Sequence, residues 1–166
     1  SPQRRAGRAR GPGGPVHVKP RAKAPAAAGI DTEVIDARLR ELSRRLRRVA
    51  ARQPASARQL ASDEDLQDIL ARNLEVAIQT CIDIAYHLCG AHGVVPTAAA
   101  EAFAELARRG LIDRRLAGRL QLAVGFRNVL VHEYTAIDWK IARQVMRTGT
   151  RDLAAFGKAV LGMLDG

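Results

Sequence analysis

Aromatic residues are scarce in this sequence, and long β-branched runs are missing. Hydrophobic residues make up 47% of the 166 residues but aromatic residues only 4%. Alanine, leucine and arginine dominate instead, a composition that favours helices over strands. The length suffices for one domain with a hydrophobic core and is short for two. The sequence therefore predicts a single all-α domain.

No stretch of about 18 uncharged apolar residues occurs, so the sequence predicts no membrane span. The N-terminal segment also lacks the apolar core of a signal peptide. The only two cysteines, Cys81 and Cys89, are eight positions apart in one expected helix. About 12 Å of helix rise separates them, so they cannot form a disulfide with each other. Reduced thiols fit a cytosolic protein, and we expect a cytoplasmic location.

Acidic residues are absent from positions 1–29, which hold seven basic residues, five prolines and five glycines. We predict that 1–29 is a disordered Arg/Pro/Gly-rich tail, because it has too few apolar side chains to offset the entropy lost on ordering. The preferred interpretation is a linker or extension, and the alternative is an electrostatic tether for RNA. Residues 30–166 hold 20 basic and 17 acidic residues, so most of the net charge of +10 lies in the tail.

Apolar residues recur at spacings of three and four along residues 30–166, which predicts a helical domain. The expected helices cover about 31–52, 63–88, 97–109, 113–130 and 137–164. Short connections predict an antiparallel bundle of about five helices. Thr135 and Asp138 have the spacing of a capping box before the last helix, and Gly149 is a candidate interruption within it.

Four polar residues share one face of the second expected helix. At 100° per residue, Arg72, Gln79, Asp83 and Tyr86 fall within about 40° of one line. A solvated face is the simpler interpretation. The functional alternative is that Arg72 and Asp83 line a groove together with the motif described next.

Polar residues of several kinds are concentrated between Arg127 and Tyr134, at the end of the fourth expected helix. Asn128 and His132 are four residues apart and can form a hydrogen bond within a helix. Arg127 and His132 are five apart, about 140° around a helix, so they converge only if the helix frays near Val131. We expect such fraying because of the Thr135 cap.

These residue types suit cleavage of RNA. A histidine titrates near neutral pH and can move the 2′-hydroxyl proton, while an arginine neutralises the negative charge of the phosphorane.

Glu133 is the only acid in the run, which argues against a magnesium site, and no cofactor is expected. Nor do His87, Cys89 and His92 provide the second cysteine pair of a structural zinc site. The expected reaction is metal-independent and yields a 2′,3′-cyclic phosphate. From composition alone, an ion pair and a helix cap remain the commoner explanation.

The order of these residues resembles the HEPN superfamily, and the spacing Arg127, four residues, His132, one residue, Tyr134 looks like its HepT-type toxin branch. The resemblance covers roughly residues 31–162. The segments that carry it besides the motif are 73–79, 82–85, 102–107 and 125–128. The basic tail departs from the pattern.

The resemblance implies a toxin that cleaves RNA as a homodimer, with Arg127 and His132 as the catalytic pair and Asn128 as a supporting residue. It implies that Tyr134 lies in the active site and is AMPylated by a cognate nucleotidyltransferase antitoxin. Such proteins usually place a polar side chain from the second helix near the site, for which Asp83 is the candidate. A different class of function stays open: a non-catalytic HEPN bundle that binds a nucleotidyltransferase or a nucleotide.

Overall fold

The computed structural model describes residues 29–166, and the prediction of a disordered tail falls almost entirely on residues outside this range. The described residues form six α-helices and one 3-10 turn, with no strand among them. All-α structure is therefore confirmed for this part of the chain. The elements are α1 (Thr32–Ala50), α2 (Ala57–Ser62), α3 (Glu64–Ala91), α4 (Ala99–Arg108), α5 (Arg114–His132), η1 (Tyr134–Ala136) and α6 (Trp139–Leu164).

Short polar side chains fix where most of these helices begin. Each N-cap side chain accepts a hydrogen bond from a backbone N–H of the first turn, which would otherwise have no partner. Aspartate does this for α1, α3, α5 and α6, and Ser56 does it for α2. The four capping aspartates can be recognised in the sequence, so the starts of α1, α3, α5 and α6 are close to the predicted ones.

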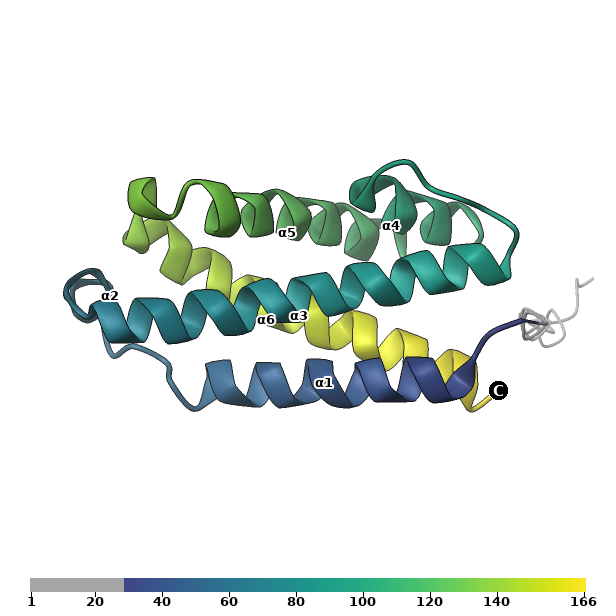
Figure 1. Ribbon diagram of the computed structural model, residues 1–166, viewed down its shortest axis with the longest axis horizontal. Helices are drawn as coiled ribbons and strands as arrows, with labels where there is room; N and C mark the ends of the chain where they lie inside the picture. The colour runs from purple at the N-terminus through teal and green to yellow at the C-terminus, as the bar shows by residue number, and fades with distance from the viewer. Residues whose placement is uncertain (1–28) are drawn as a thin grey trace, which may run out of the picture.

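The long helix α3 lies at the centre of the bundle and contacts α1, α4, α5 and α6. Figure 1 shows α1 and α3 side by side, α5 along the opposite side of α3, and α6 crossing obliquely behind α3. The C-terminal end of α5 and the N-terminal end of α6 lie at the same end of the bundle as the start of α3 (Figure 1). That end carries the motif residues.

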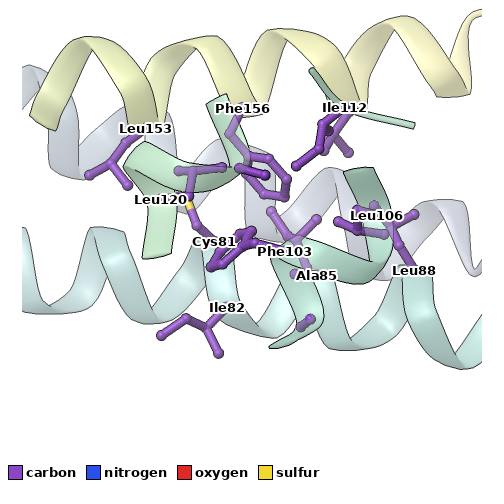
Figure 2. Close-up of a cluster of buried hydrophobic side chains, with 14 of the residues drawn as sticks. Cys81, Ile82, Ala85, Leu88, Phe103, Leu106, Ile112, Leu120, Leu153 and Phe156 are labelled. Carbon is purple, nitrogen blue, oxygen red and sulfur yellow. The ribbon is translucent and has the colours of Figure 1, made fainter. Parts of the chain in front are cut away.

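The main hydrophobic core fills the other part of the bundle. Phe103 of α4 and Phe156 of α6 meet edge to face with ring centroids 5.4 Å apart, and Figure 2 shows them between side chains of α3 and α5. Cys81 of α3 lies in this core, where burial raises the pKa of its thiol. Cys89 is also buried, and its thiol donates to the carbonyl of Ala102.

A second, smaller cluster lies at the motif end, and we call it the site-end cluster. Four partly buried side chains of the segment that carries the motif pack against this cluster: Phe126, Tyr134, Ile137 and Trp139. Its buried members are Val49, Leu60, Leu70, Ala71, Leu74, Leu130 and Met146. The motif therefore rests on a small apolar base contributed by α1, α2, α3, α5 and α6.

Three details differ from the predictions. The six-residue helix α2 was not predicted, because a segment this short shows little periodicity and only Leu60 of it is buried. Thr135 does not cap α6: it lies in the 3-10 turn, and Asp138 is the N-cap, accepting from the N–H groups of Lys140 and Ile141. α6 also runs through Gly149 without a break.

Among the residues that the structure describes, no helix combines the length and apolar character needed to cross a membrane.

Candidate functional site

The end of α5 stays helical through His132, and the expected fraying near Val131 is wrong. The N–H of Glu133 still donates to the carbonyl of Val129, which continues the helical pattern to the C-cap. Five residues of regular helix place Arg127 and His132 about 140° apart around the axis. The two side chains therefore point in divergent directions within one chain.

Arg127 is half-buried and has no carboxylate partner among the described residues. Its Nη1 donates to Oδ1 of Asn128 at 3.2 Å. Its Nε–H is buried and finds no acceptor in this part of the chain, an arrangement that costs about 1–3 kcal/mol. Asn128 therefore forms its hydrogen bond with Arg127. The spacing of four residues had suggested His132 as its partner instead.

His132 is exposed at the last helical position of α5, next to Val131, which is 40% exposed. An exposed imidazole at the end of a helix can reach a substrate. The structure thus places the two predicted catalytic side chains on one surface segment without bringing them together.

Tyr134 turns back from the 3-10 segment onto α3. Its hydroxyl donates a hydrogen bond to Oδ1 of Asp68, and its ring packs edge to face on Trp139 with centroids 5.8 Å apart. Partial burial raises the pKa of Tyr134, and the Asp68 carboxylate raises it further. Sequence reasoning missed Asp68. It precedes Arg72 by one helical turn, and nothing local connects it with a tyrosine 66 positions later.

Asp83 and Arg72 pair with other side chains, and no contact of either with the motif is seen among the described residues. Asp83 pairs with Arg38 of α1 at 3.3 Å and accepts from Gln79, while Arg72 pairs with Glu75 at 3.2 Å. Asp83 is fifteen residues beyond Asp68 on the continuous helix α3, or about 22 Å of helix rise. The polar side chain that α3 does bring to the motif is Asp68.

An open groove lies beside the motif, between α3, α5 and α6, with a volume of about 370 Å³. Leu74, Leu122, Phe126 and Val145 are among its lining residues. Leu122 is 75% exposed, and Ile141 on the first turn of α6 is 64% exposed. Large apolar side chains left this exposed are typical of surfaces that contact another protein.

Metal ligands do not cluster in the described range, where no group of three His, Cys, Asp or Glu residues is arranged to hold an ion. The ring of His87 instead accepts a hydrogen bond from the backbone N–H of Asp31 at 3.1 Å.

Comparison with known proteins identifies the family. Residues 35–160 match the family described as Ribonuclease HepT-like. The mRNA nuclease HepT of Shewanella oneidensis is 32% identical to this chain over 99 residues, which cover 59% of this chain and 74% of the relative.

Solved structures give the same result. The tri-AMPylated HEPN toxin of Shewanella oneidensis in complex with its MNT antitoxin has a TM-score of 0.73 and 27% identity, covering 78% of this chain and 98% of that chain. A cytosolic Bacillus subtilis protein of unknown function matches with a TM-score of 0.70, covering 82% and 92% of the two chains. Its 16% identity supports the fold alone. With the family match extending over most of the described bundle, the chain belongs to the HepT-like ribonuclease family.

Proposed function

We propose that this protein is an endoribonuclease toxin that cleaves RNA without a metal ion and leaves a 2′,3′-cyclic phosphate. The observation that carries the proposal is the state of Arg127: a guanidinium held by Asn128, with no carboxylate partner in the described chain, five residues from an exposed His132. A guanidinium without an acidic partner is suited to bind a phosphate. The similarity to an mRNA nuclease supports RNA as the substrate.

The chemistry follows from these two side chains. His132 accepts the proton of the 2′-hydroxyl, whose oxygen then attacks the adjacent phosphorus. Arg127 stabilises the extra negative charge of the phosphorane. The bond from phosphorus to the 5′-oxygen breaks, and an acid returns a proton to that leaving oxygen. The products are a 2′,3′-cyclic phosphate and a 5′-hydroxyl end.

A second copy of the chain supplies what one copy lacks. Arg127 and His132 diverge by about 140° on α5, so one phosphate cannot easily contact both from the same helix. We therefore propose a homodimer that pairs the motifs of two copies, with the exposed Leu122 and Ile141 buried at the interface. In this arrangement His132 of the partner subunit provides the acid.

The dimer is tested with Leu122→Glu, which places a charge on this surface. Sedimentation should change from dimer to monomer, and RNA cleavage should fall with it. The matched control is Leu161→Glu, at another exposed leucine, on α6. A monomeric wild-type protein that cleaves RNA, or a dimer unaffected by Leu122→Glu, would contradict the arrangement.

A cognate nucleotidyltransferase antitoxin neutralises the toxin by AMPylating Tyr134. The matching Shewanella oneidensis toxin is AMPylated and bound to an MNT antitoxin, and a related toxin-antitoxin structure contains AMP-PNP. Nucleotide phosphates attached to Tyr134 bring negative charge and bulk close to the motif. They would compete with RNA phosphates for Arg127 and block access to the site.

The reaction is tested by incubating the purified protein with total RNA in excess EDTA and analysing the new ends. Cleavage should persist in the chelator and give 2′,3′-cyclic phosphate and 5′-hydroxyl ends. Loss of cleavage in EDTA would overturn the metal-independent mechanism. No cleavage under any condition, with nucleotidyltransferase binding intact, would favour the non-catalytic binding bundle.

A further inference from the structure

The hydrogen bond between Tyr134 and Asp68 joins the proposed modification site to a carboxylate of α3. Asp68 is an exposed residue, and no ion pair or hydrogen bond of the described chain engages its side chain apart from that with Tyr134. The ring of Tyr134 also packs edge to face on Trp139. The phenolic proton is therefore already directed at a group that can accept it.

Transfer of a nucleotidyl group to a tyrosine needs the phenolic oxygen as nucleophile, and a neutral phenol is a weak one. Burial and the Asp68 carboxylate both raise the pKa of Tyr134, so the free phenolate is scarce near neutral pH. The proton must then leave as the oxygen attacks. A base in hydrogen-bond contact with the hydroxyl meets the geometric requirement for this step.

We propose that Asp68 is the general base for AMPylation of Tyr134, an inference that rests on the proposed neutralisation by a nucleotidyltransferase. The bond from the Tyr134 oxygen to the α-phosphorus of ATP forms while the bond from that phosphorus to pyrophosphate breaks. The phenolic proton passes to the carboxylate of Asp68 and from there to water, which reaches this exposed residue. Toxin and antitoxin thus share the active site of the modification, with the base supplied by the toxin.

Asp68→Asn separates basicity from positioning. The asparagine oxygen can still accept a hydrogen bond from Tyr134, but the amide cannot take up the proton. Asp68→Glu keeps a carboxylate near the same place. Asp65→Asn is the matched control, because it removes the same charge one turn earlier in α3, where no contact with Tyr134 is made.

The experiment measures single-turnover AMP transfer from ATP labelled at the α-phosphate, with purified cognate nucleotidyltransferase and Mg²⁺, and locates the adduct by mass spectrometry. Asp68→Asn should lower the rate of Tyr134 modification by about 100-fold, the lower range for loss of a general base. The affinity of the two proteins and the helical circular dichroism should remain unchanged. Asp65→Asn should stay within about twofold of wild type, and Asp68→Glu should restore part of the rate.

Modification of Asp68→Asn at the wild-type rate would overturn the inference and leave the proposed function intact. An equal loss in Asp65→Asn would also overturn it, because general charge and not proton transfer would then be responsible. If the wild-type chain takes up no AMP, the proposed neutralisation fails and the role of Asp68 fails with it. RNA cleavage by the wild-type protein, measured separately, distinguishes that outcome from failure of the ribonuclease proposal.

Discussion

The two apolar clusters of the bundle differ in size and in what lies on them. The main core joins α1, α3, α4, α5 and α6 through side chains that are almost entirely buried. The site-end cluster has seven buried members, and it carries the segment with Arg127, His132 and Tyr134. The polar contacts at the motif, Arg127 with Asn128 and Tyr134 with Asp68, lie outside both clusters. Stability and the proposed chemistry are thus concentrated in different parts of the same helices.

Truncating the main core should have the largest effect on stability. Phe156→Ala removes a fully buried ring that contacts Phe103, and we expect the free energy of unfolding to fall by about 3–5 kcal/mol. Urea denaturation followed by circular dichroism measures the change. Ala155→Gly, at the exposed neighbouring position of α6, is the control and should cost about 1 kcal/mol. If Phe156→Ala lowers the free energy of unfolding by less than this control does, the main core does not dominate stability.

The site-end cluster should respond less. Leu130→Ala removes one of its buried side chains from α5, and we expect a loss of about 2 kcal/mol in the free energy of unfolding. RNA cleavage should fall as well, because Leu130 anchors the helical segment that carries the motif. A stability loss matching that of Phe156→Ala would erase the distinction between the two clusters.

Tyr134→Phe tests the polar contact at the site end. Loss of the hydrogen bond to Asp68 should cost about 1 kcal/mol. The raised pKa of Tyr134 adds a pH signature. Above the ordinary value of 10.0 the unfolded phenol ionises before the folded one, so the wild-type protein should lose stability with rising pH more steeply than Tyr134→Phe. Parallel stability curves for the two proteins between pH 9 and 11 would contradict this.

Asp83→Asn should have the smallest effect. It breaks a partly exposed ion pair with Arg38, so the free energy of unfolding should change by at most about 1 kcal/mol. Cleavage should remain at the wild-type level, because Asp83 lies about 22 Å of helix rise from the residue that contacts Tyr134. A large loss of cleavage with normal folding would return Asp83 to the active site, across a dimer interface.

Local signals explain what could be predicted from the sequence. The spacing of apolar residues and the capping aspartates are local features, each contained within one or two helical turns. They therefore predict the long helices and most of the positions at which these begin. The contact between Tyr134 and Asp68 joins residues 66 positions apart and depends on how α3 packs against α5. Periodicity along α3 placed Asp83 and Arg72 on one face, but it contains no information on which turn faces the motif.

The divergence of Arg127 and His132 shows a second limit of local reasoning. Their closeness in sequence suggests one catalytic pair within one chain. Such a pair needs a frayed helix end, because five residues of regular helix direct the two side chains apart. Regular hydrogen bonding through Glu133 keeps α5 helical instead. The sequence indicates candidate side chains for the site. Their relative direction depends on how the helix ends and, in the proposed dimer, on the second copy.

The most direct test of a ribonuclease site in the HepT-like family measures RNA cleavage by Arg127→Ala and His132→Ala beside the wild-type protein, in EDTA. We predict that each variant lowers the cleavage rate by at least about 100-fold. Circular dichroism and sedimentation should remain those of wild type, since neither side chain belongs to a buried cluster. Cleavage at the wild-type rate by either well-folded variant would contradict the account.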